Sequence, residues 1–173
     1  MYKLRELKRE DIKKINEWRN APELIELLGA PYRFINEEVD NEWFNAYMRS
    51  RNTAVRCAIV SEENDEILGL ASIVDINYVN RSAVFHIMIG DKSNRGKGIG
   101  TFATKSLIEH AFYNLNIRRI ELSVLSTNVP AIKTYEKIGF VKEGIKRQAV
   151  YKKGTYVDMI IMSLIQDEYK FGE

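Results

Sequence analysis

An α/β fold built around one mixed sheet is the fold class that this sequence predicts. Three observations point to it: short apolar stretches typical of strands, longer stretches with apolar residues at helical spacing, and Gly, Pro or Asn at the boundaries. Along the chain they follow the order β-α-α-β-β-β-α-β-α-β-β. The 173 residues have the length of one domain, so we expect a single domain, 1–173.

The first third of the chain predicts one strand and two longer helices. MYKLREL reads as a short strand, and KREDIKKINEWRN places Ile12, Ile15 and Trp18 at helical spacing. APELIELLGAPYRF is broken by proline and glycine and is expected to be partly irregular. The second helix is expected to start after Asn36, a typical N-cap, and to run to about Ser50. We expect its buried face to carry Val39, Trp43, Ala46 and Tyr47.

The middle of the chain predicts three strands followed by a helix. AVRCAIVSEENDEILGLASIVDI reads as two strands joined by the polar turn EEND. AVFHIMIG is apolar on both faces and is therefore expected near the centre of the sheet. The helix that follows has apolar residues on one face, at Ile99, Phe102, Ala103, Leu107 and Ala111.

The last third predicts a strand, a short helix and two further strands. RRIELSVL alternates cleanly, and STNVPAIKTYEKIGF has Pro130 in the first turn of a helix and Gly139 at its end. VKEGIKRQAVY and TYVDMIIMSLI read as two strands around the turn KKG. The second of these is apolar on both faces, so we expect it inside the sheet although it comes last in sequence.

Composition excludes several classes of function. The net charge of +2 does not favour a nucleic-acid partner, because such proteins depend on a strong basic field. No apolar run reaches the length of a membrane span, and the charged N-terminal segment does not resemble a signal peptide. Cys57 is the only cysteine, and no His, Asp or Glu cluster has metal-ligand spacing, so we expect no disulfide and no metal site. A cytoplasmic location is expected.

The segment SNRGKGIGTFATKSL needs a functional interpretation because glycines stand between a strand and a helix. A dinucleotide fingerprint fits poorly, since Thr101 occupies the place of the third glycine. A P-loop fits less well, since Gly98 stands where Ser or Thr is needed. A helix N-terminus with glycines at its start can still hold a pyrophosphate, and Arg95 and Lys97 would add charge at its rim. The alternative is a plain glycine-rich turn that caps the helix.

Two motifs together resemble the GNAT superfamily of N-acetyltransferases. RGKGIG, residues 95–100, resembles that family's Arg/Gln-x-x-Gly-x-Gly/Ala signature and follows an apolar strand. NVPAIKTYEKIGF, residues 128–140, resembles its Asn-x-x-Ala-x-x-x-Tyr-x-x-x-Gly-Phe segment. The resemblance extends from residue 2 to about residue 165. It is strongest to the branch that holds ribosomal-protein N-terminal, spermidine and amino-sugar acetyltransferases.

The resemblance implies direct acetyl transfer from acetyl-CoA to an amine, without an acyl-enzyme. It implies a mixed sheet of about seven strands flanked by helices, with splayed central strands, and the pantetheine arm would pair with the open edge of one of them. The pyrophosphate would lie on the backbone N–H groups of the glycine loop. The implied acetyl-CoA contacts are Ile87, Met88, Ile89, Arg95, Gly96, Lys97, Gly98, Ile99, Gly100, Thr101, Asn128, Ala131 and Lys137.

Two residues are candidates for catalysis. Tyr135 matches the tyrosine that the family uses to protonate the leaving thiolate. Some relatives carry a Glu as base where this chain has Val84, so this chain lacks that base. His86 shares the strand face of Val84 and is our candidate for the base. Lesser candidates for the base or for a substrate contact are Asp75, Glu37 and Glu38.

The resemblance leaves the acceptor open. We expect a small-molecule amine, either a polyamine or a nucleotide amino sugar, with N-terminal acetylation of a protein and a non-catalytic acyl-CoA-binding module as alternatives. A homodimer is a further expectation. In this branch the acceptor pocket is built from the first two helices and the strand-end loops. Here that region contains Glu17, Trp18, Arg19, Glu23, Glu26, Tyr32, Phe34, Glu37, Glu38 and Trp43. The acids suit a polyamine, the aromatics and Arg19 suit a nucleotide sugar, and the acids also suit plain solvated helix faces.

Overall fold

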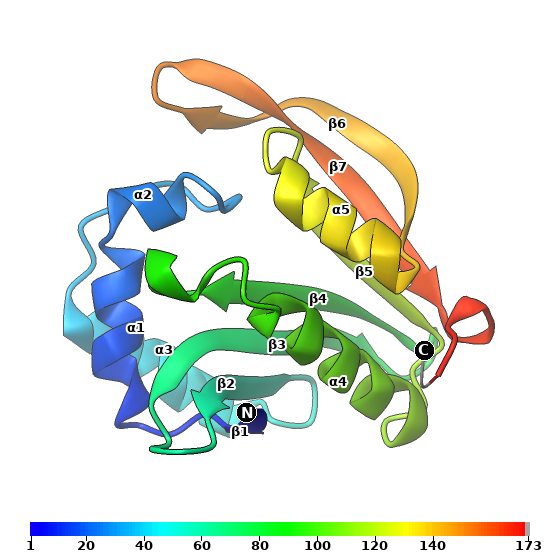
Figure 1. The fold of residues 1–173 in the computed structure, drawn as a ribbon, viewed down its shortest axis with the longest axis horizontal. Coiled ribbons are helices and arrows are strands. Elements are labelled where there is room, and N and C mark those ends of the chain that lie inside the picture. Colours follow the sequence, from blue (N-terminus) through cyan, green and yellow to red (C-terminus); the bar gives the residue numbers. More distant parts are fainter. Residues whose placement is uncertain (172–173) are drawn as a thin grey trace.

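Seven strands and five α-helices make up most of residues 1–171, which the computed structural model describes (Figure 1). The strands are β1 (Tyr2–Glu6), β2 (Val55–Ser61), β3 (Ile67–Asn77), β4 (Ser82–Ile89), β5 (Arg119–Leu125), β6 (Val141–Lys152) and β7 (Thr155–Ile165). The helices are α1 (Asp11–Arg19), α2 (Pro22–Ile25), α3 (Glu37–Arg49), α4 (Ile99–Tyr113) and α5 (Val129–Ile138), with 3-10 turns at Lys92–Asn94 and Gln166–Glu168.

All seven strands join one sheet in the order β1-β2-β3-β4-β5-β7-β6. Neighbouring strands are antiparallel except β4 and β5, which are parallel and are connected through α4. The predicted mixed sheet is therefore confirmed. β4 occupies the middle of the sheet and β7 lies between β5 and β6, so both doubly apolar strands have neighbours on either side, as expected.

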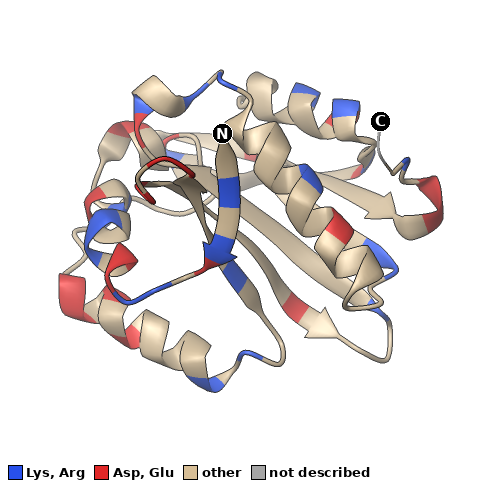
Figure 2. Ribbon diagram, turned by 60° about the horizontal axis from the view of Figure 1, so that its bottom comes forward, with Lys and Arg blue, Asp and Glu red and all other residues tan. Residues whose placement is uncertain are grey.

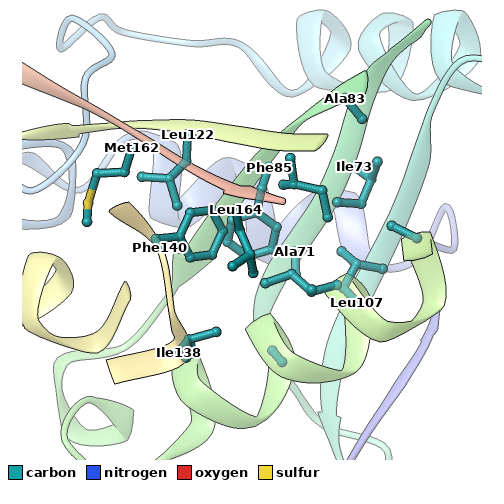
Figure 3. Close-up of a cluster of buried hydrophobic side chains, with 14 of the residues drawn as sticks. Ala71, Ile73, Ala83, Phe85, Leu107, Leu122, Ile138, Phe140, Met162 and Leu164 are labelled. Carbon is teal, nitrogen blue, oxygen red and sulfur yellow. The ribbon is translucent and has the colours of Figure 1, made fainter. Parts of the chain in front are cut away.

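The two faces of the sheet carry separate apolar clusters. Helices α4 and α5 cover one face, where Phe85, Leu107, Leu122, Phe140 and Leu164 converge (Figure 3). Helices α1, α2 and α3 cover part of the other face. Because successive residues of a strand point to opposite faces, β4 contributes side chains to both clusters. A group on β4 is therefore placed on one face or the other by its position in the alternation.

Local sequence signals set the helix ends. The side chain of Asn36 accepts a 2.7 Å hydrogen bond from the backbone N–H of Glu38 and caps α3, as predicted. Gly139 ends α5 in the left-handed conformation, with φ of 115°. α2 is a single helical turn that begins with Pro22, within the segment expected to be partly irregular.

The predicted buried face of α3 is right in part. Tyr47 is buried and Trp43 packs partly buried against the same cluster, as expected. Val39 is 56% exposed and Ala46 is exposed, whereas Asp40 and Phe44 are buried instead. The cause is Asp40, which the apolar pattern could not assign to the core. It is completely buried because Arg19 and Asn16 on α1 bind its carboxylate.

Charged residues of both signs are spread over the molecule. Basic and acidic segments alternate along the ribbon in Figure 2, in keeping with the net charge of +2. No helix within residues 1–171 is long and apolar enough to cross a membrane.

Candidate active site

Strands β4 and β5 separate within the sheet and leave a fork. Residues 82–84 of β4 pair with residues 119–121 of β5, and the pairing stops there. Beyond that point β4 continues to pair only with β3, and β5 continues to pair only with β7. The diverging strands are visible in Figure 1. The splay implied by the sequence resemblance is therefore present, and its open end lies next to the N-terminus of α4.

The open edge of β4 presents free peptide groups toward the fork. The N–H of Gly90 donates to the carbonyl of Leu68 on the β3 side. Since peptide groups alternate in direction along a strand, those of Met88 also face β3, and those of Ile87 and Ile89 face the fork. The side chain of Met88 is buried against α1 and α3. Of the three strand residues proposed to contact acetyl-CoA, Ile87 and Ile89 thus have backbone groups available to a ligand.

The glycine loop, residues 95–100, leads from the open end of the fork into α4. Gly96 and Gly98 have φ of 75° and 80°, in the left-handed region that favours glycine. A Cβ added at either position would meet no heavy atom within 4 Å. The loop is therefore unobstructed at these two glycines, and its backbone there is open to a ligand. Gly98 is the N-cap of α4, so the first N–H groups of the helix point into this space.

The two cations of the loop have different surroundings. Lys97 is exposed. Arg95 turns back instead, and its Nη2 donates a 2.9 Å hydrogen bond to the carbonyl of Gly90. The Nε of Arg95 is buried without a partner among the described residues. Arg95 therefore ties the loop to the end of β4 and does not stand at the rim as a free cation.

Tyr135 lies on the α4 and α5 side of the sheet. Its ring contacts Phe85 of β4 edge-on, with centroids 6.4 Å apart, and Phe140 at 5.7 Å. Desolvation raises the pKa of the Tyr135 hydroxyl to about 12. The hydroxyl is thus protonated throughout the physiological range, and no described residue forms a hydrogen bond with it.

His86 lies on the opposite face of β4, directly after Phe85. It is exposed, and it forms a row across three strands with Ser72 of β3 and Arg56 of β2. Partial desolvation lowers the pKa of His86, and the nearby guanidinium of Arg56 lowers it further. The imidazole is therefore neutral at pH 7. Arg56 itself stacks over Trp43, 4.8 Å from the ring centroid, and its Nε is buried without a partner in the described part of the chain.

The remaining acetyl-CoA candidates lie on α4 and α5. Ile99 is buried in the core, while Gly100 and Thr101 are half-buried in the first turn of α4. Asn128 caps α5 by accepting a 3.3 Å bond from the N–H of Ala131, and its Nδ2 donates to the carbonyl of Leu27. Lys137 is exposed in the last turn of α5. Asn128 is thus committed to the fold in this conformation.

The segment EWRN, residues 17–20, has a structural role. Trp18 is only 3% exposed, and its indole N–H donates to Asp91. Arg19 binds the buried carboxylate of Asp40. Asn20 bonds both the N–H and the carbonyl of Ile35. Trp18 and Arg19 are therefore not available to stack on or bind a nucleotide sugar in this conformation.

The other residues expected around the acceptor vary in availability. Glu17 pairs with Lys14 and Glu26 pairs with Lys153. Glu37 and Glu38 are exposed in the first turn of α3. Tyr32 and Phe34 form an exposed aromatic pair with centroids 5.5 Å apart.

One feature of the site lies outside the motifs that the sequence singled out. A cavity of about 120 Å³ lies where β4 and β5 part, lined by Asp75, Ser82, Ala83, Val84, Arg119 and Glu121. A register shift in β3 between Val74 and Asn77 places Asp75 there. The sequence contains no turn signal at this point, and only the positive φ of Asp75, 51°, marks it in the structure.

Neither a cysteine nucleophile nor a metal site accompanies the fork. Burial raises the pKa of the Cys57 thiol to about 11, so it is protonated at neutral pH and is a poor nucleophile. Within the described residues, no group of three or more His, Cys, Asp or Glu is arranged to hold a metal ion.

Comparison with known proteins agrees with this geometry. Residues 4–161 match the family model described as an acetyltransferase (GNAT) domain. The chain is 30% identical to spermidine N(1)-acetyltransferase of Vibrio cholerae over 167 residues, which cover 96% of this chain and 94% of that one. It is 32% identical to the enzyme of the same name from Escherichia coli K12, over 96% of this chain and 87% of that one. The crystal structure of the Vibrio cholerae enzyme with CoA and spermine superposes with a TM-score of 0.90, 27% identity and 97% coverage of both chains.

Proposed function

The chain belongs to the GNAT acetyltransferase family and is an acetyl-CoA-dependent N-acetyltransferase, and from this premise we propose that it acetylates a primary amine of a polyamine. The observation that carries the proposal is the fork between β4 and β5, with Tyr135 on one face of β4 and His86 on the other. Acetyl-CoA supplies the activated acetyl thioester. The donor and the acceptor would then meet in the fork from opposite sides of the sheet.

The donor side fits coenzyme A through backbone groups. The peptide groups of Ile87 and Ile89 would bind the extended pantetheine arm like an additional strand, and they are also placed to stabilise negative charge on the thioester oxygen. The glycine loop and the start of α4 offer unpaired N–H groups for a pyrophosphate, with Lys97 beside them. Ile99, Gly100, Thr101, Asn128, Ala131 and Lys137 remain proposed contacts from the family resemblance.

Tyr135 would assist departure of the thiolate. Its raised pKa keeps the proton on the hydroxyl, and no described residue competes for it. A thiol has a pKa near 8.5, well below that of Tyr135, so complete proton transfer is uphill. The hydroxyl would therefore act chiefly by donating a hydrogen bond that strengthens as charge develops on sulfur.

His86 would accept the proton of the amine. An alkylamine has a pKa of about 10 and is mostly protonated at pH 7, so it must lose a proton before it attacks. His86 is exposed on the acceptor face and neutral at that pH. Transfer from an ammonium to this imidazole is uphill, so His86 would chiefly accept, directly or through a water molecule, the proton that the nitrogen loses as its bond to the acetyl carbon forms.

A polyamine is the favoured acceptor because both relatives reported above are named as spermidine acetyltransferases. Trp18 and Arg19, two of the residues that suited a nucleotide sugar, are engaged within the fold. The exposed pair Tyr32 and Phe34 remains available to such a ligand, so the nucleotide amino sugar stays in the test. Acetylation of a protein N-terminus is the alternative that the experiment below must separate.

The test is thiol release from acetyl-CoA with spermidine, a nucleotide amino sugar and an N-terminal peptide as acceptors. We expect turnover with spermidine above the other two. Tyr135→Phe is expected to lower kcat about 100-fold with little change in acetyl-CoA affinity, because it removes one hydrogen bond made in the transition state. Tyr113→Phe, at an exposed position on α4, is the matched control and should behave as wild type. If the protein binds acetyl-CoA but releases no thiol with any of the amines, the proposed reaction is refuted.

Three further expectations belong to the proposal. A cytoplasmic location is supported by the use of acetyl-CoA, a metabolite of the cell interior. A single domain over 1–173 is supported by the family match across most of the chain. A homodimer is supported by the edge strand β6, where Val141, Ile145 and Tyr151 are more than half exposed, and sedimentation analysis would measure it.

A further inference from the structure

Asp75 is a carboxylate at the fork whose charge acts on Arg56 and His86 without a direct bond to either. It lies in the irregular part of β3, where the register with β4 shifts between Val74 and Asn77, and its φ is 51°. Its side chain forms no hydrogen bond or ion pair with any residue that the structure describes. A non-glycine residue in this conformation is uncommon, and such bulges redirect side chains beside active sites.

The cavity that Asp75 lines is on the same face as His86. The register pairs Ser82 with Arg119 and Val84 with Glu121, so these four side chains share the face on which His86 lies. The cavity of about 120 Å³ has room for an ammonium group and adjoining methylene groups. Val84 supplies apolar lining for a hydrocarbon chain, and Asp75 and Glu121 supply carboxylates.

The charges around the cavity leave Asp75 as the carboxylate free to bind a cation. Arg119 holds Glu121 at 3.0 Å and also binds Glu143, so the negative charge of Glu121 is already compensated. Arg56, the other cation near this face, interacts electrostatically with Asp75, but it is stacked on Trp43 and forms no ion pair with that carboxylate among the described residues. An ammonium group is therefore the ligand that the cavity suits, and a second anion would be repelled.

The separation between the cavity and His86 matches a diamine. Val84 and His86 are two residues apart on the same face of a strand, or about 6.6 Å. An alkyl chain of about four methylene groups joins two nitrogens over such a distance. When one amine group of a diamine lies at His86 and faces the fork, the other amine group would reach the cavity.

We propose that Asp75 binds the non-reacting ammonium group of a diamine-type acceptor and so selects polyamines over monoamines. This inference rests on the proposed acetyl transfer and names the acceptor contact within that site. Val84, which stands where some relatives have a glutamate, then contacts the methylene chain and leaves recognition of the charge to Asp75.

The test compares two acceptors of equal length, 1,4-diaminobutane and butylamine, with the wild type and Asp75→Asn. Asparagine tolerates a positive φ as aspartate does, so the backbone is retained and only the charge is lost. We expect kcat/KM for diaminobutane to fall about tenfold, chiefly through KM, and that for butylamine to change less than about twofold. Asp65→Asn is the control, since Asp65 has a φ of 57° in the turn between β2 and β3, away from the fork.

The outcomes separate this inference from the reaction itself. An unchanged preference for diaminobutane in Asp75→Asn would overturn the role of Asp75, and so would an equal loss with both acceptors. Thermal unfolding and CoA binding of the variant should match wild type. A wild-type protein that acetylates no amine at all would overturn the proposed reaction, and this inference with it.

Discussion

The donor side of the fork offers mainly backbone groups, whereas the acceptor side offers mainly side chains. On the donor side, the open edge of β4 and the glycine loop offer backbone groups. On the proposed acceptor side, individual side chains such as His86 and Asp75 would supply the chemistry, while neighbouring side chains on α1 stabilise the fold. A backbone site needs glycine at fixed positions, whereas a side-chain site uses the same residue types as ordinary structural contacts.

The largest effect that this comparison predicts is a loss of folding stability when Arg19, on the acceptor side, is replaced. Arg19→Leu would leave the fully buried carboxylate of Asp40 with Asn16 as its remaining partner. We expect a loss of about 3 kcal/mol in the free energy of unfolding, because a buried charge loses its counter-ion. Chemical denaturation measures it, and Lys14→Ala, which breaks an exposed pair with Glu17, should cost under about 1 kcal/mol.

Activity of Arg19→Leu sharpens the same prediction. Measured where the variant is fully folded, its KM for spermidine should stay close to that of wild type. A large rise in KM without loss of stability would mean that Arg19 contacts the acceptor after all, contrary to its assignment as a structural residue.

The next effect concerns the donor side. Gly98→Val places a β-branched side chain at a φ of 80°, in space that is open to the ligand. Backbone strain and blocked approach should weaken CoA binding about 30-fold, as measured by calorimetry. Gly154→Val is the matched control, because Gly154 has a φ of 83° and equally open surroundings in the turn between β6 and β7. Equal loss of affinity in both variants would refute the role of the glycine loop.

A smaller effect is expected from His86. Its pKa is lowered from 6.5, so the imidazole is neutral at pH 7 and gains a proton only as the pH falls below 6.5. The rate of acetyl transfer should therefore fall on the acid side of that value. His86→Gln should lower kcat/KM for the amine about tenfold and remove this acid limb from the pH profile. His110→Gln, at a half-buried position on α4, should retain the limb. An unchanged profile in His86→Gln would exclude it as the proton acceptor.

The sequence predicted the sheet and the backbone geometry of the glycine loop for a physical reason. Strand alternation, the cap at Asn36 and the glycines of the loop are local signals, and each determines the backbone near it. The splay could be expected only from the family resemblance, because it depends on where pairing between β4 and β5 ends.

The acceptor side was less predictable because its contacts join distant segments. Burial of Asp40 depends on Arg19, 21 positions away in sequence, and it changed part of the buried face that was expected for α3. Asp75 lines the cavity because of a bulge in β3, and no residue pattern in the sequence predicts that bulge. The residue types alone could not show which acids compensate structural cations and which remain free.

The most direct test of the backbone-built donor site is amide hydrogen exchange, resolved by residue, with and without acetyl-CoA. We expect the amides of Ile87, Ile89 and the glycine loop to exchange more slowly when acetyl-CoA binds. The amides of residues 17–20, at the C-terminal end of α1, should exchange as they do without it. Binding of acetyl-CoA that leaves the amides of Ile87, Ile89 and the glycine loop unprotected would contradict the assignment of the fork as the donor site.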